Sequence, residues 1–217
     1  MKILALETSS SCVNIGLCLD SGMIFEESLL NRGSQFILGA VDKLLKDARI
    51  KLDDVDVFGI SVGPGSFTGL RVGLSFAKGF SYSCRRPLVA VESLKVWASP
   101  LCRKSTNIVV LLDAKRTCVY GQAFLCQNGI PKAIHEPFMG PVKDFLAQVP
   151  RESVFVGSAC GLYEKEIREM FSDSEKIFIE KQNTPKAKDL IALVLHDAKN
   201  KKIEFNPEAC VTPIYFW

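Results

Sequence analysis

The sequence lacks the short signatures of common metal and disulfide sites. None of its eight cysteines form a C-x-x-C pair, and most lie inside apolar runs. We therefore expect buried, reduced thiols in a reducing compartment. The two histidines, His135 and His196, are far apart and are in neither H-x-x-x-H nor H-E-x-x-H spacing. No metal cage can be assembled from residues that are close in sequence.

Long apolar runs and strong charge are also lacking. No apolar stretch is long enough to cross a membrane. Only Lys2 precedes the first apolar run, which Glu7 ends, so the start does not resemble a signal peptide. A net charge of +3 does not by itself indicate nucleic-acid binding. We expect a cytosolic protein, and its 217 residues with 47% hydrophobic content suffice for one large domain or two small lobes.

A glycine-rich stretch, Gly63-Pro64-Gly65-Ser66-Phe67-Thr68-Gly69, follows an apolar run and precedes a predicted helix over 70–84. A strand, a glycine turn and a helix in this order can aim backbone N–H groups at an anion. Gly63 and Gly65 permit positive φ, and Ser66 or Thr68 can cap the helix. The alternative is a tight connection that binds nothing. The stretch is neither G-x-G-x-x-G nor a P-loop, which would add a lysine.

Apolar periodicity predicts an alternation of strands and helices. The expected strands span 3–6, 13–19, 23–30, 55–62, 87–91, 108–112, 119–126, 154–156 and 176–179, with a further terminal strand over 214–217. The expected helices span 34–48, capped by Ser34, then 70–84, 92–101, 143–148, 162–171 and 185–199, the last capped by Thr184 and opened by Pro185. Asn128-Gly129 predicts a hairpin turn.

The helix after the glycine turn is unusually apolar. Its polar residues form one narrow stripe, at Arg71, Ser75, Lys78, Tyr82 and Arg85. A helix of this kind must be covered on more than one side. It is either a central helix of the fold or one that a partner covers. For a partner surface we expect a patch formed with the preceding helix, near Phe36, Leu38, Leu70, Leu74 and Lys78.

The two halves of the chain follow the same plan. In each, a buried strand ends in an acid, Glu7 or Asp113, and a second strand starts at a valine, Val13 or Val119, with the same spacing. An apolar strand, a glycine turn and a helix follow in both. This predicts an α/β fold of two lobes, residues 1–104 and 105–217. Glu7, Thr8, Gly63, Gly65, Ser66 and Asp113 would then line a nucleotide-phosphate cleft. Coincidence between two generic α/β halves is the alternative.

The sequence contains few candidate catalytic residues. Ser66 does not lie in a G-x-S-x-G motif, and no serine or cysteine is paired with a histidine. Glu7 and Asp113 could hold Mg²⁺ through water beside a phosphate, although single acids at strand ends are as often solvated turn residues. We assign no catalytic residue and no metal ligand. No cofactor is required, and ATP or ADP with Mg²⁺ would bind weakly at best.

Three motifs in order resemble the TsaB (YeaZ) family. They are Ile3-Leu4-Ala5-Leu6-Glu7-Thr8-Ser9, the glycine stretch continued through Leu70-Arg71-Val72-Gly73, and Leu112-Asp113-Ala114. The resemblance covers nearly the whole chain. It implies the two-lobed actin-like ATPase (ribonuclease H-like) fold and a role in making threonylcarbamoyladenosine in tRNAs that read codons starting with adenine. It also implies a non-catalytic subunit that pairs with its larger paralogue TsaD, the transferase, and works with the small ATPase TsaE.

This chain departs from the family pattern at three places. Gly33 stands where many relatives have a histidine, the usual Asp-Ala-Arg reads Asp113-Ala114-Lys115, and the chain ends in Trp217 rather than in a charged residue. The first departure removes the remnant of a metal ligand. The second puts an arginine contact in doubt, and the third loses a terminal charge.

Three classes of function follow. The first is a non-catalytic partner subunit, a homodimer when alone, that reaches tRNA only through its complex. The second is an enzyme, either a glycoprotease-like metallopeptidase, whose ligands are missing, or a phosphotransferase that uses Glu7 and Asp113. The third is a free-standing nucleotide sensor. Pairing with a partner and nucleotide affinity would discriminate among them.

Overall fold

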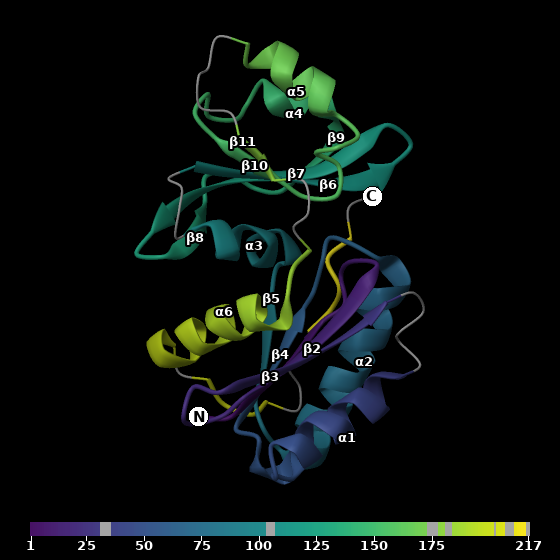
Figure 1. The fold of residues 1–217 in the computed structure, drawn as a ribbon, viewed down its shortest axis with the longest axis vertical. Helices are drawn as coiled ribbons and strands as arrows, with labels where there is room; N and C mark the ends of the chain where they lie inside the picture. Colours follow the sequence, from purple (N-terminus) through teal and green to yellow (C-terminus); the bar gives the residue numbers. More distant parts are fainter. Residues whose placement is uncertain are drawn as a thin grey trace. The chain divides into compact units, whose positions relative to one another are not determined.

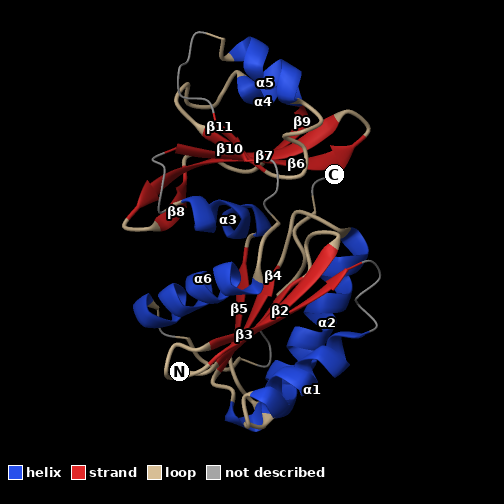
Figure 2. Cartoon of the chain, in the orientation of Figure 1, coloured by secondary structure: helices blue, strands red, loops and turns tan. Residues whose placement is uncertain are grey.

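The protein forms two compact units, each with its own β-sheet (Figures 1 and 2). The computed structural model describes residues 1–30, 36–102, 107–172, 178–180, 184–201, 203–206 and 211–215. The first unit comprises Met1–Val96 and Pro185–Tyr215, and the second comprises Trp97–Thr184.

The first unit is built on a sheet with the strand order β3-β2-β1-β4-β5. β1 (Ile3–Glu7), β2 (Cys12–Cys18) and β3 (Ile24–Leu30) form an antiparallel meander. β4 (Val57–Ser61) pairs parallel with β1, and β5 (Leu88–Val91) pairs parallel with β4. Because β1 and β4 are parallel neighbours, their carboxyl ends, which carry Glu7 and the glycine turn, lie at the same edge.

Helices cover both faces of this sheet (Figure 1). α1 (Ile37–Asp47) and α2 (Phe67–Cys84) lie on one face, and α6 (Ala187–Asn200) lies on the other. The short turn η2 (Leu52–Asp54) precedes β4. Alternate residues of each strand face α1 and α2, as the two-residue period of a strand requires. The core on this side includes Leu4, Leu6, Val13, Ile15, Leu17, Val41, Leu44, Phe58, Ile60, Leu74, Ala77 and Phe80.

The C-terminal helix packs on the first unit rather than the second, which differs from the predicted division into 1–104 and 105–217. Gly16 and Gly59 present bare backbone to α6, and a Cβ added at either position would lie within 3 Å of α6 side chains. Asn14 Nδ2 also donates to the Pro185 carbonyl at 3.0 Å. The apolar stripe of α6 predicts burial, but it does not tell which of two sheets it covers.

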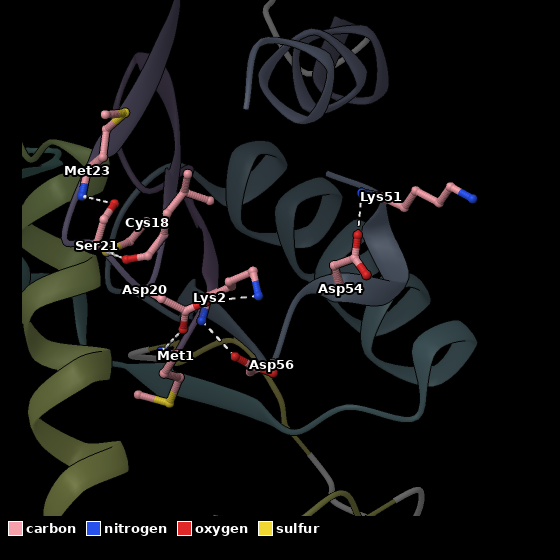
Figure 3. Close-up of polar contacts among 10 residues, drawn as sticks. Met1, Lys2, Cys18, Asp20, Ser21, Met23, Lys51, Asp54 and Asp56 are labelled. Atoms are coloured by element: carbon pink, nitrogen blue, oxygen red, sulfur yellow. Dashed lines mark hydrogen bonds and ion pairs between the residues drawn. The ribbon is translucent and has the colours of Figure 1, made fainter. Parts of the chain in front are cut away.

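Surface polar contacts fix the start of β1 (Figure 3). The backbone N–H of Lys2 donates to the Asp56 carboxylate at 2.7 Å, just before β4, and Lys2 Nζ lies 2.9 Å from Asp20. The N-terminal amine also donates to Asp20. Asp20 is exposed and Lys2 and Asp56 are half-buried, so these contacts contribute little to the free energy of folding.

The second unit contains a sheet with the order β11-β10-β6-β7-β8, and β9 pairs with β7. β6 (Asn107–Lys115) and β7 (Cys118–Gln127) form a long antiparallel hairpin, which β8 (Ile130–Ala133) and β9 (Phe138–Pro141) extend. β10 (Val154–Val156) and β11 (Phe178–Glu180) continue in parallel from β6. Its helices are α4 (Val142–Leu146) and α5 (Glu164–Met170), and their side chains and one sheet face form the second core. The chain enters this unit through α3 (Ser93–Ala98) and η3 (Ser99–Leu101).

The predicted duplication is confirmed at the level of topology. The second sheet, read from its other edge as β8-β7-β6-β10-β11, has the order and strand directions of β3-β2-β1-β4-β5. In both units the acid, Glu7 or Asp113, lies on the central strand that joins the meander to the parallel strands.

The helix ends show which of the predicted capping residues are correct. Ser66 caps α2, since its Oγ accepts from the Gly69 N–H at 3.2 Å. α6 begins two residues later than predicted, at Ala187, and its capping residue is Lys186, whose N–H donates to the Asp189 carboxylate at 3.2 Å. The predicted cap Ser34 lies outside the described residues. Residues 211–215 form no strand, although the Ile214 N–H donates to the Val62 carbonyl at 2.7 Å.

One cysteine pair overturns the expectation of reduced thiols only. Cys102, directly after η3, and Cys126, in β7, form a disulfide with their Cα atoms 5.2 Å apart. They are 24 residues apart in the sequence. No sequence motif predicts this pair, because the β6–β7 hairpin brings the two cysteines together. The other described cysteines are free, and most of them are buried.

A search of the described ranges for helices that could cross a membrane finds none of sufficient length and apolarity.

Candidate functional site

Five of the six residues predicted to line a phosphate cleft come together at the carboxyl ends of β1 and β4, and the sixth, Asp113, lies in the second unit. Glu7 ends β1 and Thr8 follows it, while Gly63, Gly65 and Ser66 connect β4 to α2. Thr8 N–H donates to Ser61 Oγ at 3.2 Å, which ties the two strand ends together. Glu7 and Thr8 are fully buried. The sequence pattern therefore predicted which residues gather here.

A row of glycines lets α2 approach the β1–β2 turn closely. Gly65, Gly69 and Gly73 are spaced by four residues and face Thr8 and Ser9. A Cβ added at Gly65 would lie 2.2 Å from the Ser9 carbonyl oxygen, and one at Gly69 would lie 2.2 Å from the Thr8 carbonyl oxygen. At Gly73 it would meet Thr8 Oγ1 at 2.2 Å. Such distances are far inside van der Waals contact, so only glycine fits at these positions.

The N–H groups of the glycine turn are engaged within the protein. Gly63 N–H donates to Ser93 Oγ at 2.9 Å, and Ser66 N–H donates to the Ser9 carbonyl at 2.7 Å. Gly69 N–H donates to Ser66 Oγ. In a phosphate cradle such groups point at the ligand. Here these three N–H groups bond within the protein, and a nucleotide-phosphate site at the turn stays a prediction.

The Glu7 carboxyl group is buried and partly hydrogen-bonded. Its Oε1 accepts from Ser9 N–H at 2.8 Å and from Ser9 Oγ at 2.5 Å. Its Oε2 has no hydrogen-bond partner within the described part of the chain. Burial raises the pKa of Glu7 from 4.5 to about 7, against the opposing effect of the Ser9 hydrogen bonds. Glu7 thus takes up a proton near neutral pH.

The pKa of the corresponding acid in the second unit, Asp113, is shifted in the opposite direction. Asp113 accepts from Lys115 Nζ at 2.5 Å and from Lys115 N–H at 2.8 Å. The Lys115 hydrogen bond lowers the pKa of Asp113. Ser158 Oγ accepts from the Asp113 N–H at 3.1 Å. Lys115, which replaces the arginine of the family pattern, therefore serves as an ion-pair partner of Asp113. A cleft shared by Glu7 and Asp113 stays a prediction.

The structure corrects two of the five residues expected at the partner surface. Leu70 and Leu74 are 1% and 6% exposed and face the interior. The glycine row turns toward the β1–β2 turn, and this orientation places Leu74 in the core beside β1 and β4. Phe36 and Leu38 are 57% and 59% exposed, and Lys78 is exposed as well.

An apolar groove lies between α1 and α2 on this exposed side. Its volume is about 430 Å³, and it is lined by Leu38, Arg71, Val72, Ser75, Phe76, Gly79 and Phe80. Val72, Phe76 and Gly79 were not predicted as interface residues. They recur at i, i+4 and i+7 and so lie on one face of the helix, opposite the face of Leu70, Leu74 and Ala77. The helical period of the sequence could therefore have identified them as a second apolar face. Sequence alone could not tell which of the two apolar faces is buried.

The C-terminal segment braces the start of α2 beside this groove. Tyr215 OH accepts from Arg71 Nε at 2.9 Å, and the Tyr215 and Phe67 rings lie 5.3 Å apart. The Arg71 guanidinium lies 3.8 Å from the centre of the Phe67 ring, which is a cation–π contact. Arg71 is thereby held at the rim of the groove. Gly33 and Trp217 lie outside the described residues.

No group of three or more His, Cys, Asp or Glu side chains able to hold a metal ion occurs within the described ranges.

Comparison with known proteins gives consistent matches. A family model for TsaD, described as tRNA N6-adenosine threonylcarbamoyltransferase, matches residues 30–204. The tRNA threonylcarbamoyladenosine biosynthesis protein TsaB of Bacillus subtilis is 27% identical over 198 residues, which cover 89% of this chain and 86% of the relative.

Solved structures agree on the fold. YeaZ from Pseudomonas aeruginosa superposes with a TM-score of 0.84 at 22% identity, covering 99% of each chain. A putative N-acetylmannosamine kinase from Listeria monocytogenes has a TM-score of 0.53 at 12% identity, covering 92% of this chain and 99% of the kinase. The fold is the two-lobed actin-like one expected from the sequence.

We predict that Gly73→Ala destabilises the protein and that Gly79→Ala does not. A Cβ at position 73 overlaps Thr8, whereas one at position 79 has no atom within 4 Å. The first change should lower the free energy of unfolding by about 2 kcal/mol or more. The second should raise it by up to about 1 kcal/mol, because alanine favours helix over glycine. Urea unfolding of both variants measures this, and equal stability would contradict the close approach.

We predict that Glu7 makes stability fall as pH rises. Its pKa is raised on folding from 4.5 to about 7, so the folded state binds more protons than the unfolded state between these values. The contribution is complete below pH 4.5 and is lost as pH rises through 7. Glu7→Gln stays neutral and should gain up to about 3 kcal/mol over wild type between pH 4.5 and pH 8.

Urea unfolding of wild type and Glu7→Gln at a series of pH values tests this. The matched control is Glu136→Gln, the same change at an exposed position, whose stability should follow wild type at every pH. Parallel stability curves for Glu7→Gln and wild type would show that folding does not shift the pKa of Glu7.

Proposed function

We propose that this chain, which belongs to the TsaD family and within it to the TsaB (YeaZ) group of tRNA threonylcarbamoyladenosine biosynthesis proteins, acts as a non-catalytic pairing subunit. Its partner is a larger TsaD-like paralogue that carries out threonylcarbamoyl transfer to tRNA, and a TsaE-like ATPase works with the pair. The groove between α1 and α2 is the observation that carries this proposal.

The groove supports pairing because it combines an apolar floor with charged edges. Val72, Phe76 and Phe80 line it, and Leu38 stands 59% exposed beside them. Contiguous exposed apolar surface of this kind marks interfaces. Arg71 and Lys78 lie on the same helix, so a partner with apolar side chains flanked by acidic ones would fit.

A partner with the same fold would present the same two helices. Two copies of α1 and α2 then pack as four helices about a two-fold axis, and a paralogue replaces one copy in the heterodimer. We therefore propose a homodimer when the chain is alone and a heterodimer with the TsaD-like paralogue.

The proposal of a non-catalytic role rests on the hydrogen bonds and ion pairs made by the residues of the predicted phosphate site. The glycine turn donates its N–H groups to Ser93, Ser9 and Ser66, and Asp113 is paired with Lys115. ATP or ADP with Mg²⁺ accordingly binds weakly at best. Tight, stoichiometric ATP binding to the lone chain in calorimetry would contradict this. We place the protein in the cytoplasm, where it meets tRNA through its complex.

We predict that Leu38→Glu abolishes pairing while the fold survives. Leu38 is exposed in the lone chain, so the glutamate is solvated there; in the interface it would be a buried, unpaired charge. The expected loss is about 3 kcal/mol of association free energy, or more than 100-fold in affinity. Light scattering measures the mass, capture on the immobilised TsaD-like paralogue measures pairing, and circular dichroism checks the fold.

Leu162→Glu is the matched control. Leu162 is 65% exposed and lies in the second unit, away from α1 and α2 in the sequence. This variant should pair like wild type. A folded Leu38→Glu protein that still dimerises and still captures the paralogue would place the interface on another surface.

We predict no threonylcarbamoyl transfer by the chain alone. The purified protein is incubated with threonylcarbamoyl-adenylate and tRNA, with and without the paralogue, and modified adenosine is measured by mass spectrometry. Product should appear only when the paralogue is present, and Leu38→Glu should reduce it as it reduces pairing. Turnover by a preparation free of other subunits would refute the non-catalytic role.

A further inference from the structure

The Cys102–Cys126 disulfide closes the open end of the β6–β7 hairpin in the second unit. In the ladder, Asn107 at the start of β6 pairs with Leu125 of β7, which directly precedes Cys126. Cys126 itself pairs with Pro131 of β8 on its other side. Cys126 is therefore fixed by neighbouring strands, and Cys102 lies a few residues before β6, just after η3.

This placement keeps the two sulfur atoms together even when no bond joins them. The hairpin already closes most of the 24-residue separation through its backbone ladder. Little additional chain entropy is lost when the disulfide forms in the folded protein. The effective concentration of one thiol at the other is then high, which favours formation of the intramolecular bond over a mixed disulfide.

The other cysteines show why this pair is distinct. Cys12, Cys18 and Cys160 are buried and free, and burial raises the pKa of each. For Cys160 it reaches about 12, so the reactive thiolate is almost absent at neutral pH. Cys84 and Cys118 are half-buried but have no disulfide partner within the described residues, whereas Cys126 is half-buried in β7 and lies beside Cys102. An external disulfide can reach Cys126, whereas the buried thiols are shielded.

We propose that Cys102 and Cys126 form a reversible redox site that exchanges with low-molecular-weight disulfides of the glutathione class. The Cys126 thiolate attacks one sulfur of the oxidised small disulfide, forms a mixed disulfide and releases one small thiolate. The Cys102 thiolate then attacks the Cys126 sulfur, which forms the intramolecular bond and releases the second small thiolate. Two protein thiols lose two electrons and two protons, and one small disulfide is reduced to two thiols.

The site lies at the end of the segment through which the chain passes from the first unit to the second. At the start of this segment, Ser93 N–H donates to the Gly63 carbonyl at 2.7 Å, and Ser93 Oγ accepts from Gly63 N–H at 2.9 Å. At its other end, the disulfide ties Cys102 to β7. Oxidation thus adds a covalent anchor to a segment whose first residue holds the glycine turn. The inference does not depend on the proposed function.

The test equilibrates the folded full-length protein in glutathione buffers of increasing oxidised fraction. Acid quenching, denaturation and maleimide mass-tagging then count the free thiols. Eight should be found at the reduced end and six at the oxidised end, since two of the eight cysteines become joined. Peptide mapping should place the bond between Cys102 and Cys126. Oxidation should raise the melting temperature by about 5 °C.

Two variants control the experiment. Cys102→Ser lacks the resolving thiol, so Cys126 should keep the small thiol as a mixed disulfide, the count should fall from seven to six, and the shift in melting temperature should be lost. Cys118→Ser, a half-buried and free cysteine of the same strand, should fall from seven to five. Eight thiols in wild type throughout, a bond between other cysteines, or a disulfide that reduced glutathione cannot open in the folded protein would each overturn the proposal.

Discussion

The close approach of α2 to the β1–β2 turn governs the first unit. Gly65, just before the helix, and Gly69 and Gly73 within it carry no side chain, so the backbone at the start of α2 lies against Thr8 and Ser9. With this face fixed, the rotation of α2 about its axis is fixed as well. Leu70 and Leu74 then point inward, and the Val72–Phe76 side is left facing the groove beside Leu38.

The same constraint changes the chemistry of the site. The Ser9 carbonyl of the β1–β2 turn accepts a hydrogen bond from the Ser66 N–H, which ties the glycine turn to the end of β1. Glu7 is sealed from solvent, so its pKa rises, whereas the partly exposed Asp113 pairs with Lys115 and its pKa falls. The pKa values of two acids at equivalent positions of a duplicated fold are therefore shifted in opposite directions, because burial dominates at Glu7 and the Lys115 hydrogen bond dominates at Asp113.

The two units share the same sheet topology, but their helices and surfaces differ. Gly157, after β10, also meets backbone closely, since a Cβ there would lie 2.1 Å from the Leu111 carbonyl oxygen. However, the helix that follows, α5, spans only Glu164–Met170, and it carries no glycine row. The long helix with an outward apolar side belongs to the first unit. Shared strand order thus coexists with an exposed apolar groove on the first unit.

The sequence by itself determined most elements, the duplication, the cap at Ser66 and the gathering of Glu7, Thr8 and the glycine turn. These features depend on local periodicity, turn chemistry and the meeting of parallel strand ends, which are encoded in short windows. The resemblance of three motifs was sufficient to indicate the family.

Only the tertiary structure decided the remaining features, because each depends on contacts between residues distant in the sequence. The orientation of α2 depends on which glycines meet the β1–β2 turn, and the location of α6 depends on bare backbone at Gly16 and Gly59. The Cys102–Cys126 bond depends on hairpin register, and the raised pKa of Glu7 depends on complete burial. Spacing along a chain gives the period of a face, but packing decides what that face meets.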